Sequence, residues 1–234
     1  MKNEDITSTL KDLHSVPEAR RDDDWYEKLF ETLPLGHYAL YSTEPQKAPD
    51  GFHYYYASLL DKNADLKARE IISLDEETLE DCLNRGAGIV IFPDMDCKKD
   101  PLWILSYGEL HAFYLYENFS GDPEDIEEMI EAEENGLSED ADISVEKPDD
   151  EFIHPGARAM LKKFFGGLGF QDVEIAILRD PSQAPSRSLV ISLEEDDFST
   201  PGQLDEVVQT VSWLLPPHRP VILDTEIDGE FYAL

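Results

Sequence analysis

Histidine, cysteine and serine are the side chains whose spacing most often reveals catalysis or metal binding, and here they form no familiar pattern. No two histidines are four residues apart, and none has a zinc-like spacing to Cys97. No serine occurs in the Gly-x-Ser-x-Gly motif that exposes a nucleophile in many hydrolases. We therefore predict no catalytic residue and no metal ligand among these residue types. The histidines are His14, His37, His53, His111, His154 and His218.

Two further segments have the composition of a ligand site but not its spacing. Residues 165–170 are glycine-rich, yet they follow an expected helix, whereas phosphate-binding loops follow a strand and precede a helix. Asp94, Asp96 and Asp100 could offer oxygen ligands to a hard cation. The second segment lacks the glycine and the glutamate of a calcium loop, and two lysines lie within it. We predict turns in both places, without a cofactor or a metal.

An aromatic segment at residues 102–116, LWILSYGELHAFYLY, has the strongest potential for binding. The pattern predicts strands at 102–107 and 111–116, joined by a turn at Gly108-Glu109. Tryptophan and tyrosine bury large areas and keep a polar atom, as binding faces require. The alternative is that the aromatic rings of this hairpin fill the core. The predicted binding residues are Trp103, Tyr107, Glu109, His111, Tyr114 and Tyr116.

Charge limits the classes of partner. The chain has 52 acidic and 19 basic residues, for a formal net charge of -33. Phosphate backbones and anionic membrane surfaces repel such a chain, so we expect neither nucleic acid nor membrane as a partner. A protein with a basic surface fits the charge. Solubility alone is the main alternative explanation of the acidity. Salt adaptation would give the same excess, but the eleven lysines are more than it predicts, and DNA mimicry is a third alternative.

The sequence also indicates a compartment. Two cysteines, Cys82 and Cys97, do not make a disulfide framework, which favours a reducing environment. The first 24 residues lack the apolar run of a signal peptide, and no stretch approaches the ~20 apolar residues of a spanning helix. We expect a cytoplasmic protein, whose oligomeric state the sequence leaves open.

The element pattern predicts an α+β protein of two small mixed-sheet units with helices packed on one face, joined by an acidic segment. Residues 1–24 are polar and are predicted to be a mobile arm, 25–120 form an N-terminal α+β unit, 121–151 are an acidic linker, and 152–234 form a C-terminal α/β unit. The expected helices of the first unit are 25–33 and 75–85, and its expected strands are 37–42, 52–60, 67–74 and 88–93, the last a buried apolar run.

The C-terminal unit is expected to run helix, strand, strand, helix, strand. Its pieces are a helix at 157–165, the strands VEIAIL and RSLVISL, the helix GQLDEVVQTVSWL and the ending PVILDTEIDGEFY. In this order they resemble the C-terminal domain of the bacterial enhanced serine sensitivity (SseB-type) family. The resemblance covers about a third of the chain, and the N-terminal unit resembles no known family. It implies a bacterial cytoplasmic accessory protein, with no catalytic residues to carry over.

Three functions are compatible with these features. The leading hypothesis is a non-enzymatic bacterial protein-binding or regulatory protein that recognises a basic partner. In it, the segment 103–116 anchors the partner and the acidic residues 122–151 steer it. A second hypothesis is a hydrolase or transferase with a site between the two units, built from Asp94, Asp96, Glu109 or His111. A third is an acidic structural domain without a specific charged partner.

Overall fold

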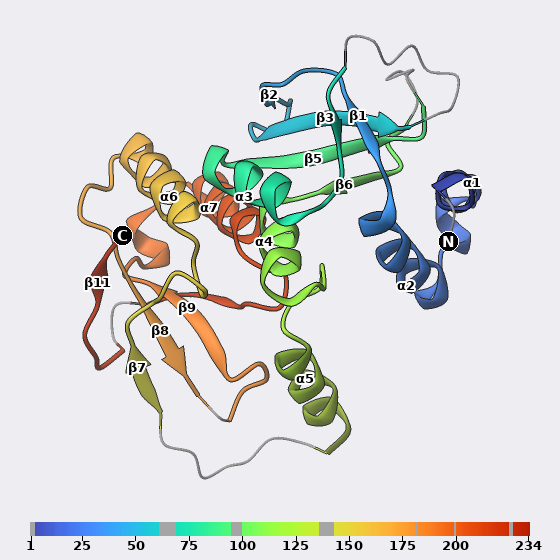
Figure 1. Cartoon of the computed structure of the whole chain (residues 1–234). Helices are drawn as coiled ribbons and strands as arrows, with labels where there is room; N and C mark the ends of the chain where they lie inside the picture. Colours follow the sequence, from blue (N-terminus) through green and yellow to red (C-terminus); the bar gives the residue numbers. More distant parts are fainter. Residues whose placement is uncertain are drawn as a thin grey trace. The chain divides into compact units, whose positions relative to one another are not determined.

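The computed structural model describes residues 3–60, 69–94, 100–135, 143–180, 182–198, 200–224 and 227–234. It confirms an α+β fold with two mixed sheets (Figure 1). The chain divides into two compact units, Met1–Tyr107 and Gly108–Leu234. The boundary between these two units precedes the acidic segment 121–151.

The first unit is built around a sheet with the strand order β4-β1-β3-β5-β6, and β2 pairs with β3. Among the described strand pairs of this sheet, only β3 and β5 run parallel; the other pairs are antiparallel. The whole of β5 is buried, as its apolar run predicted. The strands are β1 (Tyr38–Leu40), β2 (Gln46–Lys47), β3 (His53–Leu59), β4 (Ile71–Ile72), β5 (Ala87–Phe92) and β6 (Trp103–Leu105).

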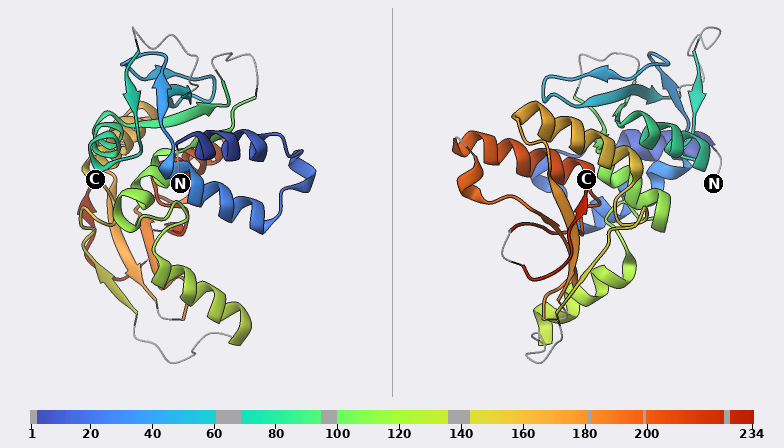
Figure 2. Two further views of the ribbon diagram at one scale, coloured as in Figure 1. Left: turned by 45° about the vertical axis from the view of Figure 1, so that its right-hand side comes forward. Right: turned by 90° about the vertical axis from the view of Figure 1, so that its left-hand side faces the viewer.

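Helix α3 (Glu76–Arg85) lies along one face of this sheet (Figures 1 and 2). Its start is fixed by Asp75, whose side chain accepts a hydrogen bond from the Thr78 amide at 3.0 Å. Its end is fixed by Gly86, which adopts the left-handed conformation (φ 66°) that a side chain would disfavour. The buried residues Leu79, Cys82 and Leu83 fall at helical spacing, so the apolar face of α3 packs inward.

The first 24 residues are not a simple arm. Helix α1 (Asn3–His14) pairs with α2 (Asp23–Thr32) as a helical hairpin (Figure 2). Leu10 is fully buried, and the Trp25 indole N–H donates to the Leu13 carbonyl at 3.0 Å. The apolar residues Ile6, Leu10 and Leu13 fall at helical spacing and are all buried, so they cover one stripe of the helix.

The second unit has the strand order β10-β9-β8-β11, with β7 paired to β8. Helices α6 (Pro155–Leu168) and α7 (Pro201–Leu214) lie side by side (Figure 2). The predicted order helix, strand, strand, helix, strand is confirmed. The strands are β7 (Ser144–Glu146), β8 (Glu174–Arg179), β9 (Arg187–Ile191), β10 (Val221–Leu223) and β11 (Tyr232–Ala233).

The acidic segment belongs to the second unit. It contains α5 (Pro123–Asn135) and β7, which adds a strand to the sheet. The predicted linker therefore contributes regular structure at both of its described ends. No described helix is both long enough and apolar enough to span a membrane.

The predicted hairpin at 102–116 is wrong in its second half. Residues from Tyr107 onward form a helix, α4 (Tyr107–Tyr116), whereas β6 remains a strand. Buried residues occupy several sides of α4, including Gly108, Leu110 and Ala112. A short segment that is apolar on all sides has no clear period, so its sequence did not separate helix from strand.

Candidate functional site

The six predicted binding residues come from two elements, β6 and α4. Trp103 lies on β6 of the first unit, where its ring packs against α2. The ring centroids of Trp25, Tyr26 and Phe30 lie 6.2, 6.0 and 5.5 Å from that of Trp103. The alternative weighed for the aromatic residues, a role in the core, therefore describes Trp103 better than an exposed anchor does.

The other five predicted residues lie on α4. Tyr107 and His111 are buried, at 0% and 1% exposure, and so offer no surface to a partner. Burial, and then the nearby Arg219 charge, lowers the pKa of His111 to about 3. Glu109, Tyr114 and Tyr116 are half-buried.

Tyr116 is held by a buried cation of the second unit. The Arg219 guanidinium donates to the Tyr116 hydroxyl at 2.7 Å, and also to the Glu151 and Phe152 carbonyls. It lies 4.6 Å from the centroid of the Phe152 ring. Because these hydrogen bonds occupy the guanidinium, Arg219 ties α4 to the segment before α6 and serves the structure of the unit.

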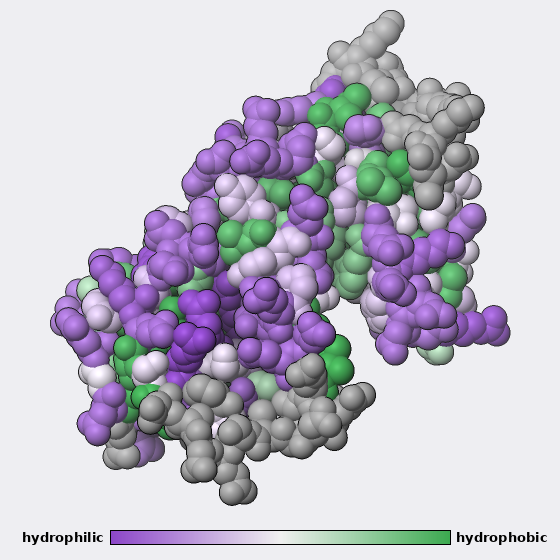
Figure 3. All heavy atoms as spheres, turned by 60° about the horizontal axis from the view of Figure 1, so that its bottom comes forward, coloured by the Kyte–Doolittle hydropathy of each residue, from purple (hydrophilic) through white to green (hydrophobic). Residues whose placement is uncertain are grey.

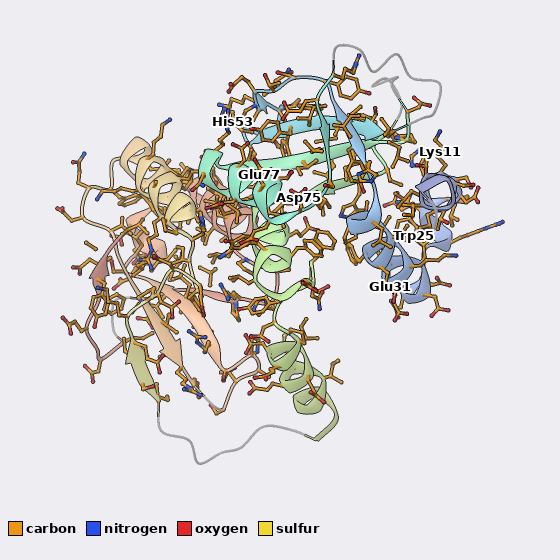
Figure 4. All side chains as sticks on the ribbon, in the orientation of Figure 1. Lys11, Trp25, Glu31, His53, Asp75 and Glu77 are labelled. Carbon is orange, nitrogen blue, oxygen red and sulfur yellow. The ribbon has the colours of Figure 1, made fainter. Side chains whose placement is uncertain are left out.

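The strongest candidate site is instead an acidic groove on the first unit. Its cavity has a volume of about 480 Å³ and lies between α3, β4 and the β1–β2 loop. We call it the acidic groove. Figure 4 marks two of its carboxylates, Asp75 and Glu77, at the start of α3. The lining residues are Leu40, Thr43, Glu44, Tyr55, Glu70, Ile71, Ile72, Ser73, Asp75, Glu77, Thr78, Asp81, Cys82 and Arg85.

The electrostatics of the groove are strongly one-sided. Among the described residues, five carboxylates and one guanidinium line it, which gives these residues a net charge of -4. The guanidinium, Arg85, already bridges two of the carboxylates, at 2.8 Å from Asp81 and 2.9 Å from Glu44. Each of these pairs is open to solvent and contributes little to stability by itself. The chain's own arginine nevertheless demonstrates that the groove can hold a guanidinium.

Hydrogen bonds from neighbouring hydroxyl groups of the chain orient two of the carboxylates. The Tyr55 hydroxyl donates to Asp81 at 2.7 Å, and the Ser73 hydroxyl donates to Asp75 at 2.7 Å. The Ser73 bond and the Thr78 amide lower the pKa of Asp75, so it stays ionised. Burial, and then the hydrogen bond to Asp81, raises the pKa of Tyr55, so its hydroxyl stays a donor. The two acids are thus oriented before any partner arrives.

The thiol in the groove, that of Cys82, is poorly suited to act as a nucleophile. Cys82 is buried on the inner face of α3, and burial raises its pKa to about 12. At neutral pH the group is a thiol, whereas the thiolate is the reactive form. Among the described residues no group of three or more His, Cys, Asp or Glu side chains could hold a metal ion. The predicted turn residues Asp96 and Cys97 lie outside the described part of the chain.

Sequence reasoning missed the groove because its residues come from four separate segments. Strand pairing brings Leu40 and Ile71 to neighbouring strands, and the packing of α3 then places Asp81 beside Tyr55. One signal was present in the sequence: the acids at positions 75, 77 and 81 recur along an amphipathic helix. Acidic residues are so common in this chain that their recurrence along one helix does not by itself indicate a binding site.

Comparison of the chain with protein-family models, with curated proteins and with solved structures finds no match in any of the three. The function is therefore inferred from the groove itself.

Proposed function

We propose that the chain is a binding protein that recognises a basic segment of another protein in its acidic groove. The observation that carries this proposal is the pre-oriented set of carboxylates around a cavity in which Arg85 already holds a guanidinium position. A lysine or arginine side chain from a partner fits the same chemistry. Hydrophilic side chains also predominate over the coloured part of the surface seen in Figure 3, with smaller apolar patches between them.

The shape of the groove favours an extended segment. Strand β4 is at the end of the described strand order, so its outer edge can pair with a peptide backbone. Ile71 lines the cavity and is 45% exposed. An exposed apolar side chain next to carboxylates suits lysine and arginine, whose aliphatic stems pack on apolar surface while their charges meet the acids.

The resemblance of the last third of the chain to the SseB-type family also stays a proposal. It is supported by the element order α6, β8, β9, α7 and β10. A cytoplasmic accessory protein that acts by binding another protein is compatible with both lines of reasoning.

The test is a titration of a fluorescently labelled, extended peptide rich in lysine and arginine. The variant Glu44→Gln/Glu70→Gln/Glu77→Gln removes three exposed carboxylates from the groove without touching the capping Asp75 or the hydrogen-bonded Asp81. Exposed ion pairs contribute up to about 1 kcal/mol each, so we expect roughly tenfold weaker binding. Fluorescence anisotropy at low and at physiological salt measures the affinity.

A matched control removes the same charge elsewhere in the unit. Glu18, Glu27 and Glu31 are exposed and lie outside the groove. At physiological salt the variant Glu18→Gln/Glu27→Gln/Glu31→Gln should bind the peptide within about twofold of the wild-type chain, because exposed charges outside the groove are then screened. Equal losses in the two triple variants would mean that total charge, and not the groove, binds the peptide.

A further inference from the structure

Helix α5 of the second unit carries an apolar stripe that its own unit leaves open. Ile126, Met129 and Ile130 recur at the spacing of one helix face. Met129 is 36% exposed and Ile130 is 55% exposed. Monomeric proteins expose single apolar residues routinely, whereas neighbouring exposed apolar residues on one helical stripe can serve as part of a contact surface.

The start of α5 is firmly held, so the stripe is presented in a defined position. Asp125 lies 3.3 Å from His218, whose side chain is 1% exposed. Gly121 packs directly on that imidazole, because a Cβ at position 121 would meet the His218 Nδ1 at 1.8 Å. Beyond this first turn, the helix projects from the edge of the unit (Figures 1 and 2).

The charge of α5 selects the kind of partner. The helix sequence PEDIEEMIEAEEN contains seven acidic residues and no basic one. Its last turn has no basic residue to offset the negative end of the helix dipole. A second copy of this chain, a nucleic acid or an anionic membrane would be repelled by these charges. A cationic partner would complement both the side chains and the dipole.

From these features we propose that the exposed face of α5 is a docking surface for a basic amphipathic helix of a partner protein. The partner's apolar stripe covers Met129 and Ile130, and its flanking lysines or arginines meet Glu127 and Glu128, which are exposed. Helices that pair in this way use apolar residues for affinity and flanking charges for the choice of partner. This surface lies in the second unit and does not depend on the acidic groove of the first.

The probe for this proposal is a short synthetic helix of leucine and lysine with all leucines on one face. A peptide of the same composition, with the leucines spread over all faces, is the comparison. Isothermal titration of the full chain should show at least about tenfold tighter binding of the amphipathic peptide, since only it can cover the stripe. Hydrogen exchange of the α5 backbone amides should slow when this peptide binds.

Two variants distinguish the contribution of the apolar stripe to peptide binding from that of the overall charge. Met129→Ser/Ile130→Ser changes exposed side chains and so preserves the fold, which circular dichroism verifies; it should abolish the preference for the amphipathic peptide. Val208→Ser removes an apolar residue of α7 that is 53% exposed, and it should keep the preference. The proposal is overturned if the wild-type chain shows no preference, if Met129→Ser/Ile130→Ser retains it, or if Asp81→Asn in the groove abolishes it.

Discussion

The carboxylates of the acidic groove differ in whether their charge is available to a partner or is already paired within the chain. In the groove, Asp81 accepts hydrogen bonds from both Tyr55 and Arg85, and Asp75 caps α3. Glu44 pairs with Arg85 but is 75% exposed, so a partner's cation can compete for it. In the binding mode that we propose, the affinity for a basic segment depends mainly on the outer glutamates, while the inner aspartates hold the shape of the groove.

The buried His111 leads to a prediction about pH. Its pKa is about 3 in the folded chain, whereas an unperturbed histidine has a pKa near ~6.5. Between these values the unfolded chain binds a proton that the folded chain does not. The stabilisation is thus complete above about pH 6.5 and is lost as the pH falls toward 3. From about pH 7 to about pH 5, the wild-type free energy of unfolding should fall about 2 kcal/mol more than that of His111→Leu.

Urea unfolding of both proteins at each pH measures this difference. The absolute stability of His111→Leu is not the readout, because leucine changes the packing as well. Titrating groups far from position 111 are common to the two proteins, so their effects cancel in the comparison, whereas His154 and His218 interact with His111 and change with it. If the two stabilities change with pH in parallel, the imidazole is not held neutral by the fold.

At the scale of elements, the packing of α2 on β6 depends on one ring. Trp103 contacts three aromatic residues of α2. We expect Trp103→Ala to lower the free energy of unfolding by about 3 kcal/mol, because it leaves a cavity between the helix and the strand. Trp103→Phe should cost about 1 kcal/mol, since a ring still fills most of the space. Chemical denaturation followed by far-UV circular dichroism measures both.

The neighbouring residue on the same strand provides the control. Ile104 is 46% exposed and points to the opposite side of β6. Ile104→Ser should change stability by no more than about 0.5 kcal/mol. A Trp103→Ala variant as stable as Ile104→Ser, but weaker in binding the basic peptide, would restore the sequence-based view of Trp103 as an anchor.

At the scale of the whole molecule, the net charge of -33 opposes folding through self-repulsion. Added salt screens this repulsion, with a Debye length near ~10 Å at about 0.1 M. We expect the melting temperature to rise by about 5 °C between about 20 and about 200 mM NaCl, which corresponds to a stabilisation of ~2 kcal/mol. Differential scanning calorimetry measures the shift.

Choline chloride at the same ionic strength is the control for specific sodium binding. It should raise the melting temperature by a similar amount, because screening depends on ionic strength. A rise with sodium alone would indicate a cation site, and no rise with either salt would show that the acidic residues are too well separated to repel each other.

The sequence by itself determined the features that depend on local interactions. The aspartates before α2 and α3, Gly86 after α3 and the apolar run of β5 each act within a few residues, so these elements were predicted within a few residues of their observed bounds. The element order of the second unit follows from the sequence for the same reason. The excess of negative charge is a property of the composition itself.

Only the tertiary structure decided the rest. It made a helix of α4, because burial on several sides outweighs a weak local pattern, and it buried Tyr107 and His111, two of the predicted binding residues. It also created the acidic groove, since Glu44, Glu70 and Asp81 become neighbours only through strand pairing and helix packing. Among 52 acidic residues, composition cannot indicate which ones converge, because convergence depends on contacts between distant segments.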